Sequence, residues 1–94
     1  MTDENVNQIT QERLVRIKKH VCYTKLVYQR VNKKLAVKLS KAEVESLVVM
    51  VLDNAGTSVL KKGKNYYVTN HSFRIQLVIN SFNCRLITAN RVTS

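Results

Sequence analysis

Hydrophobic and polar residues follow two different periods along the chain, and the period changes near Gly56. Before this glycine, apolar residues recur every three or four positions, which is the spacing of helices that bury one face. After it they recur every second position, which is typical of strands in a half-buried sheet. The pattern predicts an α+β fold, in which helices over residues 10–21, 24–35 and 41–55 precede a three- to four-stranded antiparallel meander.

The third expected helix has the most defined boundaries. Ser40 and Glu43 have the spacing of a capping box, in which the serine hydroxyl and the glutamate carboxylate each accept a hydrogen bond from the other residue's backbone N–H. Between Val44 and Ala55, apolar residues cover most of the helix circumference, so we expect this helix to be the buried one. Gly56 is expected at the C′ position that ends it.

Strands are expected over residues 59–61, 65–69, 73–79 and 84–91. One face of their sheet should pack on the third helix, while the other stays open to water or to a ligand. The residues expected on the packed face are Phe73, Ile75, Leu77, Ile79 and Leu86. The residues expected on the open face are Arg74, Gln76, Asn80, Arg85, Arg91 and one of the pair Tyr66 and Tyr67.

The chain of 94 residues is sufficient for one domain. Its polar, acidic first residues predict a flexible leader over residues 1–8 and a single folded domain over residues 9–94. No apolar run approaches the ~18–20 residues that a membrane span requires. Cys22 and Cys84 lie far apart without a histidine cluster at ligand spacing, so we expect free thiols in a reducing cytoplasm, with no metal and no cofactor.

The net charge of +10 is the most informative property of the composition, because acids and bases are segregated along the chain. From Arg13 to Lys41 there are ten lysines and arginines and no acid, and after Asn54 there are six more, again with no acid. Such a positive field attracts polyanions, which include nucleic acids, anionic membrane surfaces and acidic proteins. We therefore expect non-catalytic binding of RNA or DNA through phosphate contacts. The alternative is a protein-interaction module that binds an acidic partner or self-associates.

Three features supply candidate contact residues for nucleic acid. The second expected helix is basic, and a glycine turn between two lysines brings ammonium and backbone N–H groups together, although without the spacing of a P-loop. Arginine and aromatic residues on a sheet face hold and stack unpaired bases in other proteins. The predicted nucleic-acid-binding residues are Lys25, Arg30, Lys33, Lys34, Lys62, Lys64, Tyr66, Tyr67 and Arg74.

Catalytic chemistry finds little support in the sequence. His20 and His71 have no carboxylate beside them, and no spacing joins serine, cysteine and histidine into a triad. We expect no catalytic residue and favour a protein that is not an enzyme. A winged helix-turn-helix is also disfavoured, because its third helix would enter the major groove, and here that helix carries Glu43 and Glu45 on an apolar surface.

Several stretches resemble a family of small bacterial domains of unknown function. They are residues 22–28, residues 32–35, the capping box at Ser40 and residues 62–68, and the resemblance extends over about residues 21–92. It implies a bacterial origin and carries no known activity.

The chain is also similar to HicA-type messenger-RNA-cleaving toxins, which are small and basic, with a helix followed by a glycine-containing turn and a strand. This resemblance implies a ribonuclease whose catalytic histidine lies on the strand after the glycine. Tyr66 and Tyr67 occupy that place here, and His71 follows in a turn. A HicA-like ribonuclease is therefore the less favoured alternative.

Overall fold

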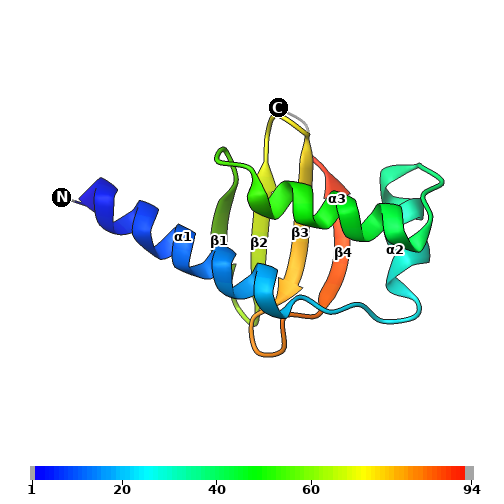
Figure 1. Cartoon of the computed structure of the whole chain (residues 1–94), viewed down its shortest axis with the longest axis horizontal. Coiled ribbons are helices and arrows are strands. Elements are labelled where there is room, and N and C mark those ends of the chain that lie inside the picture. Colours follow the sequence, from blue (N-terminus) through cyan, green and yellow to red (C-terminus); the bar gives the residue numbers. More distant parts are fainter. Residues whose placement is uncertain (1, 93–94) are drawn as a thin grey trace.

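The computed structural model describes the backbone of residues 2–92 and the side chains of residues 10–92. Three helices precede four strands, which form one antiparallel sheet in the order β1-β2-β3-β4 (Figure 1). The helices are α1 (Thr2–His20), α2 (Val27–Leu35) and α3 (Lys41–Asp53). The strands are β1 (Ser58–Lys62), β2 (Asn65–Asn70), β3 (Ile75–Asn80) and β4 (Leu86–Arg91). This arrangement confirms the predicted α+β fold with its antiparallel meander.

The three helices cover one face of the sheet. α1 lies beside α3 and β1, α3 crosses over β2, and α2 packs along β4 (Figure 1). Inward-facing strand residues such as Val68 and Ala89 join the buried residues of the helices in one core. Ile75, Leu77 and Ile79 are all buried there, which confirms the predicted packed face of β3.

The other face of the sheet carries a row of residues that pair across the strands, Leu60, Tyr67, Val78 and Thr88. The apolar members of this row do not belong to the core that the helices cover. Val78, between its neighbours Tyr67 and Thr88, is only 6% exposed, whereas Leu60 on the β1 edge is 63% exposed. The sheet therefore has the predicted open face, and Tyr67 rather than Tyr66 lies on it.

α3 begins with the predicted capping box and ends earlier than predicted. The Glu43 N–H donates to Ser40 Oγ at 3.1 Å, and the Ser40 N–H donates to Glu43 Oε1 at 2.9 Å. The expected end at Gly56 is wrong, because the helix ends at Asp53 and Asn54 is an extended C-cap. Asn54 Oδ1 accepts a hydrogen bond from the Gly56 N–H at 2.8 Å. An asparagine turn, rather than a left-handed glycine, therefore follows the helix.

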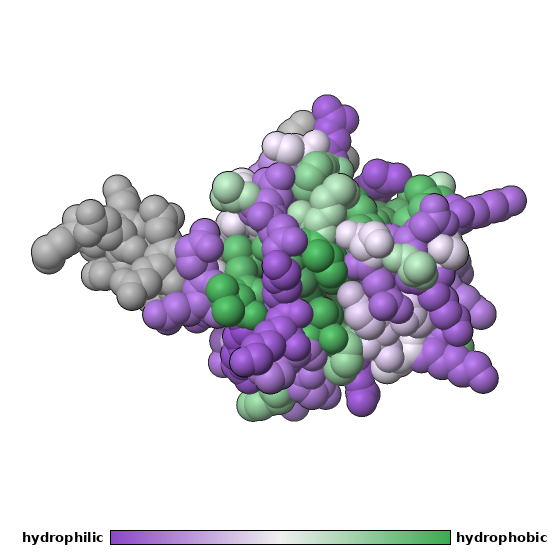
Figure 2. Space-filling view, viewed as in Figure 1, coloured by the Kyte–Doolittle hydropathy of each residue, from purple (hydrophilic) through white to green (hydrophobic). Residues whose placement is uncertain are grey.

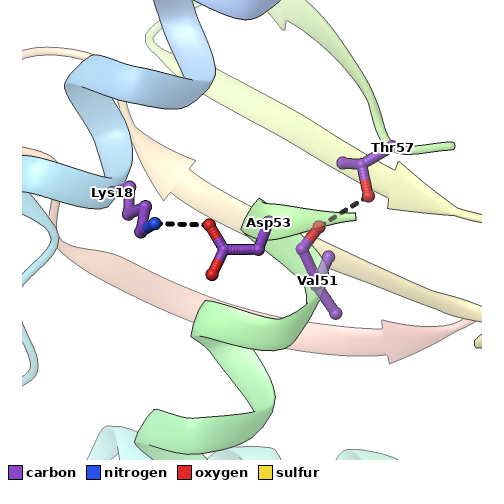
Figure 3. A network of polar contacts seen from close by, with 4 residues as sticks. All are labelled: Lys18, Val51, Asp53 and Thr57. Carbon is purple, nitrogen blue, oxygen red and sulfur yellow. Dashed lines mark hydrogen bonds and ion pairs between the residues drawn. The ribbon is translucent and has the colours of Figure 1, made fainter. Parts of the chain in front are cut away.

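Polar contacts fix the C-terminal end of α3 to its surroundings (Figure 3). Lys18 of α1 forms an ion pair with Asp53, and the Thr57 hydroxyl donates to the Val51 carbonyl oxygen at 2.6 Å. The first contact joins α3 to α1. The second joins it to the segment that leads into β1.

Asn70, at the end of β2, is fully buried and extends this network. Its Nδ2 donates to Thr57 Oγ1 and to Asn54 Oδ1, both at 2.9 Å, and its Oδ1 accepts from the Phe73 N–H at 2.9 Å. A buried amide needs such partners, because an unpaired polar group is costly away from water. One side chain thus connects the end of α3, the start of β1 and the β2–β3 turn.

α3 is less buried than predicted, because part of its wide apolar surface faces solvent. Val44, Val48 and Val51 face the core, but Val49 is 38% exposed and Met50 is 46% exposed. A helix that lies on one sheet face keeps a solvent side, and Figure 2 shows hydrophobic (green) surface among hydrophilic side chains on this face of the molecule. No helix within residues 2–92 combines the length and apolarity needed to cross a membrane.

The first two helices differ from the prediction at their start. α1 begins at Thr2, so residues 2–8 of the predicted leader have helical backbone, and the first residue of that leader lies outside the described range. Asp3 and Glu4 favour this early start, because acidic residues stabilise the positive end of the helix dipole. α2 begins at Val27, three residues later than predicted, after a turn. The boundaries of the folded domain stay a prediction.

Candidate nucleic-acid interface

α2 separates apolar from basic side chains on its two sides. Its buried residues are Val27, Val31 and Leu35, and the helix packs on β4. Side chains four residues apart lie on the same face of a helix, so burial of these three residues fixes the rotation of α2 about its axis. That rotation leaves Arg30 and Lys33 exposed.

Two adjoining hollows lie on the exposed side of α2. One of about 630 Å³ follows the helix, one of about 460 Å³ lies between the start of α2 and β4, and Leu26 and Arg30 line both. We call their cationic lining the α2–β4 basic face, which consists of Lys25, Arg30, Lys33, Lys34 and Arg85. All five residues are exposed, and Figure 2 shows long hydrophilic side chains projecting from the side where α2 lies. Among residues 10–92, no acid lines either hollow.

Contacts between distant segments build this face. The Cys22 N–H donates to the Cys84 carbonyl at 3.0 Å, and the Leu86 N–H donates to the Cys22 carbonyl at 2.9 Å, so the segment before α2 is fixed beside the start of β4. Arg30 Nη1 donates to the Ile87 carbonyl at 3.2 Å, which places this guanidinium between α2 and β4. The face therefore needs residues from both halves of the chain.

The sequence predicted Arg85 and Arg91 on the open face of the sheet, and this prediction is wrong. Arg91 pairs with Ile75, which faces the helices, and its Nη2 donates to the Leu35 carbonyl at 2.8 Å. This contact satisfies a carbonyl at the end of α2, where a cation is favourable. Arg85 lies just before β4 and belongs to the α2–β4 basic face.

The acidic residues of α3 are engaged away from the α2–β4 basic face. Glu43 caps the helix, and the hydrogen bond from the capping-box backbone lowers the pKa of its carboxyl group. Glu45 Oε2 accepts from the Tyr28 hydroxyl at 2.8 Å, and Asp53 pairs with Lys18 in the only ion pair among residues 10–92. The five cations of the α2–β4 basic face are therefore not neutralised by any described acid.

Two aromatic residues, Tyr23 before α2 and Tyr28 within it, pack against each other. Tyr23 and Tyr28 are stacked, with ring centroids 5.7 Å apart and an interplanar angle of 19°. Lys41 Nζ lies 5.5 Å from the centroid of the Tyr28 ring. Burial raises the pKa of Tyr23 to about 12, and the hydrogen bond to Glu45 raises the pKa of Tyr28. These contacts assign both rings to the junction between α2 and α3.

The structure brings together only some of the predicted contact residues. Those that share the α2–β4 basic face are Lys25, Arg30, Lys33 and Lys34. Lys62 and Lys64 lie at the β1–β2 turn, at the other edge of the sheet from β4. Arg74 lies in the β2–β3 turn, at the opposite end of the strands, with a left-handed φ of 57°.

The two predicted stacking residues lie apart from these cations. Tyr66 is 6% exposed and faces the core, where Arg13 lies 5.7 Å from its ring centroid and Arg16 Nη1 donates to its hydroxyl at 3.4 Å. Burial makes Tyr66 unavailable as the stacking surface that the sequence predicted. Tyr67 is on the open face of the sheet, whereas the helices cover the other face.

Sequence reasoning missed Arg85 as a contact residue. Strand alternation assigned it to the open face, but Cys84 before it has a left-handed φ of 56°, which interrupts the alternation. A non-glycine residue in that conformation leaves no clear signal in the sequence. Arg85 is the one member of the α2–β4 basic face that the sequence did not predict.

The other candidate groups remain separate from one another. His71 is exposed in the β2–β3 turn, and its side chain makes no hydrogen bond to residues 10–92. Cys22 and Cys84 are free thiols, and Cys84 is buried. Within residues 10–92, no three histidine, cysteine or acidic side chains are grouped so that they could hold a metal ion.

Comparison with known proteins identifies a family but no characterised relative. No curated protein and no solved structure matches the chain. A family described as "Protein of unknown function (DUF3781)" matches residues 15–90, which include α2, α3 and nearly the whole sheet. The match confirms the resemblance to a family without an assigned function, while the similarity to HicA-type toxins stays a prediction. The chain therefore belongs to the DUF3781 family.

Proposed function

We propose that this protein binds RNA or DNA through phosphate contacts on the α2–β4 basic face, without catalysing a reaction. The observation that supports the proposal is the grouping of five exposed cations around two adjoining hollows that no described acid lines. Lysine and arginine side chains neutralise phosphates and release the counterions condensed around them, which favours binding.

The spread of the charge suits a polymer better than a single anion. Arg30 and Lys34 are separated by about one helical turn, which is ~5–6 Å along the axis. Lys25 and Arg85 continue the cations past the start of the helix, beside β4. A strand with regularly repeated phosphates can contact several of these groups at once, and each contact adds to affinity.

The first test is a fluorescence-anisotropy titration of nuclease-treated protein with labelled RNA, single-stranded DNA and duplex DNA, at salt concentrations from about 50 to 200 mM. The double variant Lys33→Glu with Lys34→Glu should weaken binding at least tenfold at about 150 mM salt and reduce the slope of log Kd against log salt by about 2.

The matched control is Lys61→Glu with Lys62→Glu, which changes the net charge equally but lies on β1, three strands from β4. Lys62 was a predicted contact residue, but the proposal leaves it outside the α2–β4 basic face, so the control also tests that exclusion. This control should weaken binding less than about threefold, because exposed charges beyond a Debye length are largely screened. Equal losses in the two double variants would mean that net charge alone attracts the polyanion, and the proposal would then be abandoned.

A protein-interaction module is the second candidate, and the open sheet face favours it. Leu60 is 63% exposed there and pairs with Tyr67, which gives this face an exposed apolar side chain at its β1 edge. Lys61 and Lys62 on the β1 edge oppose self-association by strand pairing, since lysines protect sheet edges. Sedimentation equilibrium distinguishes the two candidates. A stable dimer that Leu60→Asp dissociates would favour interaction through this face.

A further inference from the structure

Phe82, in the β3–β4 turn, is the most exposed aromatic residue among residues 10–92. It is 74% exposed, whereas every other described tyrosine or phenylalanine is half-buried or buried. Its ring therefore adds little to the core and is available to a ligand.

The turn that carries Phe82 is held by several hydrogen bonds. Asn80 Oδ1 accepts from the backbone N–H groups of Phe82 and Asn83, at 2.8 and 3.1 Å. The Ser81 N–H donates to the Lys64 carbonyl at 2.8 Å, which fixes the turn to the β1–β2 turn. Because these bonds fix the backbone of the turn, Phe82 loses less conformational freedom on binding a ligand than it would in a mobile loop.

A small hollow lies between this turn and the end of α1. It has a volume of about 250 Å³ and is lined by Arg16, His20, Phe82, Asn83 and Cys84. Cavities that hold a whole small molecule usually measure about 300–1,000 Å³, so this one suits a part of a larger ligand. An aromatic ring beside a guanidinium and an amide provides a stacking surface, a partner for phosphate and a partner for a base edge.

The hollow adjoins the α2–β4 basic face. Asn83 and Cys84 line it, and Arg85, the next residue in the chain, lines the hollow between α2 and β4. Phe82 and Arg85 are three residues apart, so their Cα atoms are separated by at most about 11 Å. One nucleic-acid strand can therefore contact both places.

We infer that Phe82 stacks on an unpaired base of the strand whose phosphates lie on the α2–β4 basic face, with Arg16 and Asn83 beside that base. The inference rests on the proposed function and specifies its ligand as single-stranded nucleic acid. Stacking on an aromatic ring tolerates any base, because every base has a π-face, so we expect little sequence preference.

The test uses two labelled single strands of about 12 nucleotides, a length within the site sizes of known single-strand binders. One has normal bases, and the other consists of abasic residues with the same number of phosphates. Wild-type protein should bind the normal strand about tenfold more tightly than the abasic strand at physiological salt. Phe82→Ala should remove this difference, Phe82→Trp should keep it, and Leu60→Ala, an exposed apolar control on the open sheet face, should leave it unchanged.

The outcomes separate the two proposals. If Phe82→Ala keeps the preference for bases, the inference is wrong. If wild-type protein binds both strands equally and Lys33→Glu with Lys34→Glu weakens both, phosphate binding stands and base stacking is rejected. If neither strand binds at physiological salt but duplex DNA does, phosphate binding stands and the single-stranded ligand is rejected. If no nucleic acid binds, the proposed function fails as well, and a protein partner for Phe82 becomes the next hypothesis. Circular dichroism checks that each variant is folded.

Discussion

α2 and α3 lie on the same face of the same sheet, but they use their charged residues differently. On α3, Glu43 caps the helix, Glu45 accepts a hydrogen bond from a tyrosine and Asp53 pairs with a lysine. On α2, Arg30 donates to a backbone carbonyl, and Lys33 and Lys34 remain exposed at the end of the helix. Charge on α3 thus serves the fold, whereas charge on α2 is available to a ligand.

Apolar anchoring makes this difference possible. α2 is fixed by three buried residues, so its orientation does not depend on its lysines. Repulsion among exposed lysines is weakened by salt and solvent, so the fold tolerates it. Variants of the two regions should therefore separate stability from binding.

The largest expected effect on stability comes from Asn70→Ala. This variant removes the buried amide that joins the end of α3 to the β2–β3 turn and leaves its partners unsatisfied, so the free energy of unfolding should fall by about 3 kcal/mol. Urea denaturation measures the loss. Asn90→Ala, half-buried on β4, should lose less than about 0.5 kcal/mol. Similar losses in both variants would show that the network does not fix α3.

A smaller effect is expected from Ser40→Ala. The variant deletes the hydroxyl that accepts from the Glu43 N–H, and loss of such an N-cap typically costs about 1 kcal/mol. For a domain of this size that corresponds to a decrease in Tm of roughly 4–8 °C. Its affinity for nucleic acid should equal that of the wild type. A binding defect in this variant would contradict the separation of the two regions.

The other half of the capping box should make stability depend on acid pH. The folded state lowers the pKa of Glu43 below its ordinary value of 4.5, so the folded state binds fewer protons than the unfolded state. The stabilisation is therefore complete above the ordinary pKa and is lost as pH falls through the folded-state pKa. Thermal melts of wild type and Glu43→Gln from about pH 7 to about pH 3 should converge at the acidic end. A difference that stays constant over this range would exclude an ionic contribution of the cap.

The smallest effect on stability is expected from Lys33→Glu with Lys34→Glu, the double variant that should weaken nucleic-acid binding most. This variant should change the free energy of unfolding by less than about 0.5 kcal/mol. Neither lysine is in an ion pair among residues 10–92, and the helix-dipole stabilisation lost at the end of α2 is offset by weaker repulsion in a chain of net charge +10. Thermal melts test this directly. A large loss would mean that the lysines support α2, and the loss of binding would then have a structural explanation.

Local signals in the sequence predicted the elements well. The change of period near Gly56 predicted the order of helices and strands, and Ser40 and Glu43 predicted the start of α3. These signals depend on neighbours in the chain or on one buried face. Strand alternation likewise identified the packed side of β3, where Ile75 and Leu77 are buried.

Features set by distant contacts were not predictable in the same way. The end of α3 depends on Asn54, whose side chain is fixed by Asn70 in a strand that follows. The burial of Tyr66 depends on side chains from α1, where Arg16 donates to its hydroxyl and Arg13 lies against its ring. Arg85 joins the candidate site because the preceding residue has a left-handed conformation. Sequence patterns therefore found the charge but not its distribution over the surface.

The packing of α2 on β4 also has a consequence for the order of synthesis. The contact between Arg91 and the end of α2 joins residues 56 positions apart in the chain. A helix of nine residues is marginal in isolation, so a nascent chain that lacks β4 carries the lysines of α2 without a fixed spacing between them. Domains fold as units during synthesis, and the α2–β4 basic face therefore forms only when the fourth strand has left the ribosome. The four cations in and before α2 are thus synthesised early, whereas Arg85 and the fixed arrangement of all five come only with β4.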